Sequence, residues 1–158
     1  MAPVLGASIV QLIQVLLEMI VLIAMFLFLR NVGWTWILAL PVLLATALFA
    51  QGIGLMLSVL NARFGDVQYI VTVILGALYF LTPVIYPLSL VEEAASSLVW
   101  VVQANPMTWF VSAMHDVMYS LTVPAGWTLP GLLVLGFGTF FVGLAAFNRF
   151  SEDIGEYL

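Results

Sequence analysis

Apolar residues run through this chain in long blocks that short polar segments separate. A helix that crosses a bilayer needs about 20 largely apolar residues, and four blocks approach or exceed that length, at residues 12–29, 36–60, 69–90 and 129–147. Two shorter helical segments, 94–104 and 107–121, lie between the last two blocks. Residues 1–158 are therefore predicted to form a single domain, an all-α integral membrane protein with four transmembrane helices. The short segments predict a re-entrant or interfacial helical hairpin between the third and the fourth.

The first block carries Gln14 and Glu18. Pro3 and Gly6 precede it and interrupt helices, so we expect no uninterrupted helix before residue 12. Glu18 would then lie within about two turns of the helix start, where its carboxylate reaches the membrane surface. The alternative is a functional carboxylate inside the membrane, because charges at that depth are costly and are kept for a purpose.

Small residues recur along the second and fourth blocks. Lipid provides no hydrophobic drive between helices, so small residues on one face predict a helix-packing surface. The second block has such a face with a spacing of four residues: Thr46, Ala50, Gly54 and Ser58. Gln51 is its one long polar side chain and is expected to face protein or water. The fourth block has glycines that permit close packing: Gly131, Gly136, Gly138 and Gly143.

The third block carries Thr72, Tyr79 and Tyr86 at intervals of seven residues, which places them on nearly one helix face. One hypothesis is a face that lines a polar path for sugars, because tyrosine stacks through its ring and hydrogen-bonds through its hydroxyl. The other is an interfacial aromatic belt for Tyr86 and ordinary helix packing for Tyr79. Pro83 and Pro87 predict a kinked or unwound end for this block.

Composition excludes a soluble protein. Hydrophobic residues make up 65% of the 158 residues and charged residues 7%, too few to cover a soluble surface. The net charge of −5 owes much to acidic residues at Glu92–Glu93 and in the tail 151–158, which are typical of solvated ends. The three basic residues form no patch, so a nucleic-acid partner is not expected.

The residues that usually carry enzymatic chemistry are sparse. The chain has no cysteine, and its one histidine, His115, stands beside Asp116, too few ligands for a metal site. We interpret His115 as a polar residue at the rim of the membrane; an intramembrane hydrolase built on this pair has no further support. The sequence contains no phosphate-binding loop, so we expect neither an enzyme nor a directly bound cofactor.

The arginines predict the orientation of the chain. With four crossings and a hairpin that does not cross, Arg63 and Arg149 fall on one side of the membrane and Arg30 on the other. Basic residues favour the cytoplasmic side. Both termini are therefore expected in the cytoplasm.

Four segments together resemble one family: LNARFGDVQYIV, LYFLTPVIYPLSLV, ANPMTWFVSAMHDVMYS and FNRFSEDIGEYL. They are similar to the permease subunits of type-2 ABC exporters, and within these to the subgroup that exports polysaccharide, teichoic acid or O-antigen across the bacterial cytoplasmic (inner) membrane. Such permeases normally have six spans. The chain resembles only the last four, which suggests a fragment-like or truncated permease.

The resemblance implies a mechanism and partners. Two permease copies form a channel as a homodimer in membrane lipid, two ABC ATPase subunits supply ATP hydrolysis, and a lipid-linked glycan passes through. It places the cytoplasmic coupling loop at Asn61, Arg63 and Asp66. We assign the substrate path to Thr72, Tyr79, Tyr86 and Gln51, and the outer gate to Pro83, Pro87, Trp100, Asn105, Pro106 and Trp109.

Two other functions stay open on the sequence. An ABC exporter of a drug or a lipid would share the same permease pattern, and a membrane scaffold or assembly fragment would need no transport path. A neighbouring ATPase gene together with glycosyltransferase genes would favour glycan export. An ATPase gene alone would favour a drug exporter, and neither would favour the scaffold.

Overall fold

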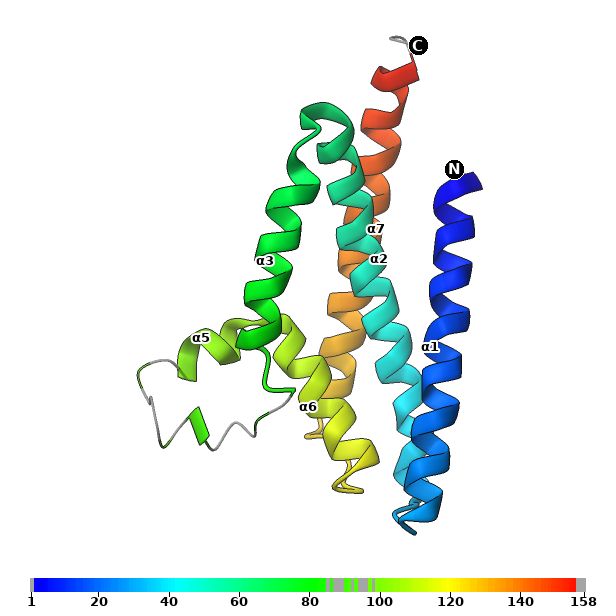
Figure 1. Ribbon diagram of the computed structural model, residues 1–158, viewed down its shortest axis with the longest axis vertical. Coiled ribbons are helices and arrows are strands. Elements are labelled where there is room, and N and C mark those ends of the chain that lie inside the picture. Colours follow the sequence, from blue (N-terminus) through cyan, green and yellow to red (C-terminus); the bar gives the residue numbers. More distant parts are fainter. Residues whose placement is uncertain are drawn as a thin grey trace.

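The chain is largely helical, as the computed structural model shows (Figure 1). It describes residues 2–84, 86, 90–91, 93, 97 and 99–155. The elements in this part are α1 (Ala2–Phe28), the 3₁₀ helix η1 (Trp34–Leu38), α2 (Ala39–Phe64), α3 (Val67–Leu81), α5 (Val99–Ala104), α6 (Pro106–Met118) and α7 (Thr128–Gly155). No strand occurs among these residues, so the prediction of an all-α chain is confirmed for them.

Two helical stretches are long and apolar enough to cross a membrane. Trp34–Phe64 combines η1 and α2 over 31 residues, and Thr128–Phe150 covers 23 residues of α7. They correspond to the second and fourth predicted spans, 36–60 and 129–147. Ile13–Phe28 and Val67–Leu81 are shorter apolar helices. Four crossings with a re-entrant hairpin therefore remain a prediction.

The predicted limits of the first and third spans, 12–29 and 69–90, are wrong as helix limits. Helix α1 already begins at Ala2, because a proline in the first turn needs no backbone donor and its fixed φ suits a helix. Helix α3 has only 15 residues and ends at Leu81. At 1.5 Å per residue it is roughly 22 Å long, less than the roughly 30 Å of a hydrocarbon core.

Helices α2 and α7 lie side by side along much of their length (Figure 1). Their backbones meet at three glycines. A Cβ atom at Gly52 would overlap the carbonyl of Thr139, one at Gly136 the carbonyl of Ala45, and one at Gly143 the carbonyl of Gly52 itself. Among the glycines predicted to permit close packing, Gly136 and Gly143 do so, whereas Gly131 and Gly138 face open space.

Helix α6 packs against both α2 and α7 and completes the core. Its Phe110 ring lies 5.2 Å from the Phe49 ring of α2, centroid to centroid. The main buried cluster joins the three helices: Val42, Ala45, Phe49, Phe110, Ala113 and Leu132. A second cluster joins the ends of α1 and α6 to the start of α2: Phe26, Ala39, Val117 and Met118.

The turn between α1 and η1 holds the C-terminus of α6. The last carbonyls of a helix have no partner inside the helix. Thr35 Oγ1 donates to the Val117 carbonyl at 2.8 Å, and Asn31 Nδ2 donates to the carbonyls of Met118 at 3.3 Å and Tyr119 at 3.1 Å. The end of α6 is therefore fixed by side chains more than eighty residues away.

The two termini and the α2–α3 turn point toward one end of the molecule, and the α1–η1 turn and the α6–α7 loop toward the other (Figure 1). Arg63 lies in the last turn of α2, Arg149 lies near the end of α7, and Arg30 follows α1. This matches the relative placement of the three arginines that the number of crossings predicts.

Candidate functional site

The break between α5 and α6 follows from the dipeptide Asn105–Pro106. A residue before proline avoids helical backbone angles, and Asn105 has φ −72° and ψ 116°. Its Oδ1 accepts from the Met107 N–H at 3.0 Å and so caps the N-terminus of α6. Pro106 begins the helix, where its missing N–H costs nothing. The predicted helix break at this dipeptide is confirmed.

The other side of the Asn105 amide connects this break to the end of α3. Asn105 Nδ2 donates to Thr82 Oγ1 at 2.9 Å, and Thr82 Oγ1 donates to the Leu78 carbonyl at 2.7 Å. Both side chains are buried. Buried polar groups need partners, and here they supply them to each other. We call this pair, Thr82 and Asn105, the polar junction.

Two further side chains of α6 reach back to α5. Thr108 Oγ1 donates to the Val102 carbonyl at 2.7 Å, and Trp109 Nε1 donates to the Gln103 carbonyl at 2.8 Å. Because α5 has only six residues, its last carbonyls depend on such partners. The two short helices are therefore linked by side chains as well as by the chain itself.

Pro83 and Tyr86 follow α3 and help to end it. A proline lacks the N–H that would extend the helix, so the carbonyls of the last turn need other donors. The Leu78 carbonyl accepts from the Thr82 N–H at 2.9 Å as well as from its hydroxyl, and the Phe80 carbonyl accepts from the Tyr86 hydroxyl at 2.8 Å. Tyr86 lies beyond the helix, so the prediction that it shares one α3 face with Thr72 and Tyr79 is wrong.

The other residues predicted for a substrate path lie apart. Thr72 and Tyr79 are exposed on α3, and the Tyr79 side chain is 54% exposed with its ring edge-on to Phe80. The Thr72 hydroxyl donates to the Gln68 carbonyl at 2.8 Å. Gln51 lies half-buried on α2. The role of these side chains in a path stays a prediction.

The structure gathers most of the predicted outer gate. Pro83 follows Thr82 of the polar junction, Pro106 follows Asn105, and Trp109 lies about one turn further along α6. Trp100 projects from α5 and is exposed. Pro87 lies outside the described residues.

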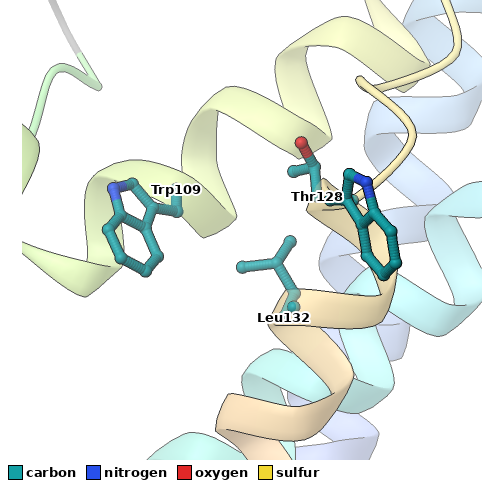
Figure 2. Close-up of a pocket in the computed structure, with 5 residues that line it drawn as sticks. Trp109, Thr128 and Leu132 are labelled. Carbon is teal, nitrogen blue, oxygen red and sulfur yellow. The ribbon is translucent and has the colours of Figure 1, made fainter.

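A hollow of about 340 Å³ lies between α6 and the first turn of α7. Figure 2 shows Trp109 on one side, Thr128 on the other and Leu132 below and between them. Trp127 and Gly131 complete the lining. No local pattern in the sequence predicts this hollow, because its lining comes from two segments that meet only in the fold.

The predicted coupling loop forms a tight turn between antiparallel helices. Asn61 Oδ1 accepts from the Gln68 N–H at 3.1 Å, and its carbonyl accepts from the Gly65 N–H at 2.9 Å. Gly65 has φ 64°, a left-handed value that glycine adopts readily. Arg63 and Asp66 are exposed on either side of it. Asn61 thus fixes the turn, while the two charged side chains face outward.

The predicted packing stripe on α2 is not the face that meets α7. Gly54 has open space around it and Ala50 is exposed, whereas Ala45 and Gly52 form the close contact. The remaining two members, Thr46 and Ser58, are half-buried and donate to carbonyls of their own helix. The predicted packing surface is therefore not the one used against α7, and its contact with another helix or a second copy stays a prediction.

The structure tests the argument made for Glu18, whereas the rim position of His115 stays a prediction. His115 is exposed and its ring stacks on Tyr119 at 4.8 Å, and no metal-binding cluster occurs in the part of the chain that the structure describes. Glu18 accepts from Gln14 Nε2 at 3.0 Å. Because α1 begins at Ala2, Glu18 lies more than four turns along it, and the argument from nearness to the helix start is wrong.

Sequence reasoning missed Thr82, Thr108, Asn31 and Thr35, which all bond across elements. One local signal existed for the first: a threonine directly before a proline at the end of an apolar block can supply the donor that the proline removes. For Asn31 and Thr35 the partners lie too far along the chain for any local signal.

The fold and these features indicate the general class of protein. Two apolar helices long enough to span a membrane and a polar junction at a broken helix are consistent with a multi-helix membrane protein. The family model for the ABC-2 type transporter matches residues 1–119, and the chain belongs to that family as a transmembrane permease.

Its relatives carry related names. An O-antigen export system permease protein of Klebsiella pneumoniae is 24% identical over 129 residues, covering 81% of this chain and 48% of the relative. The protein of that name from Myxococcus xanthus is 28% identical over 124 residues, with 78% and 47% covered. The polysialic acid transport protein of Escherichia coli is 24% identical over 156 residues, with 88% and 56% covered. The chain thus spans about half the length of these curated relatives. No solved structure matches it significantly.

Proposed function

We propose that the chain is part of the membrane-spanning subunit of an ATP-driven exporter that moves a lipid-linked glycan across the bacterial cytoplasmic membrane. The observation that carries this proposal is membership of the ABC-2 family together with relatives named for O-antigen export and polysialic acid transport. Polysaccharide, O-antigen and teichoic acid are the cargo classes that fit. The sequence contains no phosphate-binding loop, and in this proposal a partner ATPase subunit hydrolyses the ATP.

The α2–α3 turn is the contact for that ATPase. Three features support this: the turn is fixed by Asn61, it presents exposed Arg63 and Asp66, and it lies at the same end of the molecule as both termini. Charged side chains on a rigid turn can form charge-assisted hydrogen bonds with a docking partner. The end that carries the turn is the cytoplasmic end.

Helix α3 faces the glycan path and the second copy of the permease. None of its residues is buried within the chain. Its exposed surface consists of apolar side chains together with Thr72 and Tyr79. A helix with polar groups in a bilayer is best covered by protein or by a polar cargo rather than by lipid. Movement of α3 then reaches the α5–α6 pair through the polar junction, because Thr82 closes α3 and Asn105 opens α6.

The test uses inside-out membrane vesicles from cells that encode this chain, supplied with ATP and a radiolabelled lipid-linked glycan. We expect ATP-dependent uptake that is lost when residues 1–158 are deleted from the gene. Tyr79→Leu is expected to lower uptake several-fold, because ring stacking and the hydroxyl are lost while most apolar bulk remains. Tyr69→Leu is the matched control, a tyrosine that is also exposed on α3 but lies near the α2–α3 turn.

Each other outcome contradicts a defined part of the proposal. Uptake that persists after the deletion would rule out an exporter role and favour the scaffold. Loss of ATP-dependent uptake of a lipophilic dye, with glycan uptake unchanged, would identify a drug or lipid exporter. Equal effects of Tyr79→Leu and Tyr69→Leu would remove Tyr79 from the path while leaving the exporter in place.

A further inference from the structure

We infer that the hollow between α6 and α7 binds one neutral pyranose ring of the exported glycan. The inference rests on the proposed function and adds a binding site to it. The lining consists of the two indoles Trp109 and Trp127, the hydroxyl residue Thr128, Leu132 and Gly131. Its volume of about 340 Å³ falls in the lower part of the range for small-molecule sites, roughly 300–1,000 Å³.

The indole of Trp109 is held in place before any ligand arrives. Its Nε1 donates to the Gln103 carbonyl at 2.8 Å, which fixes the ring on α6 and satisfies its one polar atom. The side chain is nevertheless 51% exposed. A fixed and accessible aromatic face loses little freedom when a ligand stacks on it, which favours binding. In Figure 2 this ring stands across the hollow from Thr128.

Trp127 is the second indole that lines the hollow, and it is also accessible. Trp127 stands in the turn before α7 and its side chain is 88% exposed. A sugar ring has C–H groups on its faces, which match the negative face of an indole, and hydroxyls on its edge, which match a threonine hydroxyl. Two indoles and one hydroxyl around an apolar floor therefore fit a pyranose ring.

Charge argues against a phosphate-bearing ligand. Among the residues that the structure describes, the five that line the hollow are uncharged and offer no cation to a lipid phosphate or to an anionic sugar. Tryptophans also anchor proteins at membrane surfaces, and that role needs neither a fixed ring nor a hollow. The lining thus favours a neutral sugar ring over a lipid headgroup.

Gly131 offers a way to fill the hollow without disturbing the fold. A Cβ atom there would meet no atom within 4 Å, although the residue lines the hollow. Gly131→Leu should therefore occupy the site while α7 stays folded. Gly138 is the matched control: it lies seven residues further on α7, has equally open surroundings and does not line the hollow.

The experiment measures binding to the chain in lipid nanodiscs by saturation-transfer NMR, with maltotetraose and mannotetraose as neutral probes. Trisialic acid and glycerol 3-phosphate serve as anionic probes. We expect saturable binding of at least one neutral probe, weakened at least tenfold by Gly131→Leu and by Trp127→Leu. Gly138→Leu and Trp34→Leu, an exposed tryptophan outside the hollow, should leave it unchanged.

Three results would overturn the inference: no saturable binding of either neutral probe, binding that Gly131→Leu leaves unchanged, or equally strong binding of the anionic probes. These results are separate from those of the vesicle experiment. Transport that continues in the absence of probe binding would remove this site and keep the exporter. Probe binding without ATP-dependent transport would keep a sugar site and contradict the exporter.

Discussion

Asn105 has a short amide side chain that serves two partners at once. Its oxygen caps α6 through the Met107 N–H, and its nitrogen donates to Thr82 at the end of α3. Aspartate would keep the cap but could not donate, and leucine would lose both bonds. An amide is therefore the side chain that suits this position, where a helix starts beside the end of another.

Replacing Asn105 by alanine is expected to lower the free energy of unfolding by about 2 kcal/mol, roughly half from the lost cap and half from the lost bond to Thr82. Thermal unfolding in detergent, followed by circular dichroism, measures it. Thr82→Val removes the hydroxyl at nearly constant shape and should cost a similar amount.

The double variant Asn105→Ala with Thr82→Val separates the two contributions. If the polar junction is real, its cost should fall below the sum of the single variants by about 1 kcal/mol, because the second change removes a bond that is already broken. Strict additivity would show that the two side chains do not interact in the folded protein.

At the scale of elements, the α2–α7 pair rests on backbone contact. Ala45 and Gly52 stand seven residues apart on α2 and meet Gly136, Thr139 and Gly143 of α7. In lipid, close contact between helices must come from shape and dispersion, because lipid tails are as apolar as the side chains. Small residues allow that approach, and their positions set which faces meet.

Gly52→Ala is expected to destabilise the protein by about 2–3 kcal/mol, because its Cβ would overlap the Thr139 backbone, which cannot turn away as a side chain does. Gly54→Ala lies two residues further on the same helix with open surroundings. It should be neutral or stabilising by up to ~1 kcal/mol, through better helix propensity. Thermal unfolding of the two variants decides: equal losses would contradict the observed helix contact.

Helix α3 contrasts with this pair because it buries nothing within the chain. Its ends are nevertheless well defined. Asn61 holds the turn before it, and Thr82 and Tyr86 satisfy carbonyls in its last turn. A helix with fixed ends and no buried residue is suited to contact a partner, which is why the proposed path and copy-to-copy contact lie there.

At the scale of the whole molecule, orientation is open to a direct test, because the chain has no native cysteine. Gly65→Cys in the α2–α3 turn and Ser120→Cys in the α6–α7 loop are both exposed. In intact cells, an impermeant thiol reagent should label Ser120→Cys and leave Gly65→Cys unlabelled until the membrane is permeabilised. We expect this labelling pattern because Arg63 and Arg149 favour the cytoplasmic side, which places the α2–α3 turn inside the cell. The reverse pattern would place the turn outside and contradict the proposed ATPase contact.

Several features of the fold could be predicted from the sequence because their causes are local. Blocks of apolar residues with few charges predict membrane helices through desolvation cost alone, and two of the four predicted blocks, in α2 and α7, meet the length and hydropathy of a span. The α5–α6 break depends on Asn105 and Pro106, whose backbone preferences act within a few residues. The turn at Gly65 has the same local character.

Other features were decided by the tertiary structure. In an apolar helix the sides that face lipid and protein have similar composition, so periodicity does not say which face is covered. The sequence therefore favoured Thr46, Ala50, Gly54 and Ser58, whereas the rotation of α2 against α7 selects Ala45 and Gly52. Tyr86 likewise lost its predicted face once Pro83 ended α3 and the Phe80 carbonyl took its hydroxyl.

The residue pattern is enough to identify a helical membrane permease with a helix break at Asn105–Pro106. Packing of the helices is needed to bring polar groups from distant segments together: Asn105 with Thr82, and Asn31 and Thr35 with the end of α6. The two kinds of feature differ in the distance along the chain over which their causes act. Chain preferences and desolvation act on each segment separately, whereas these partners come together only after the helices have packed and fixed their mutual rotation.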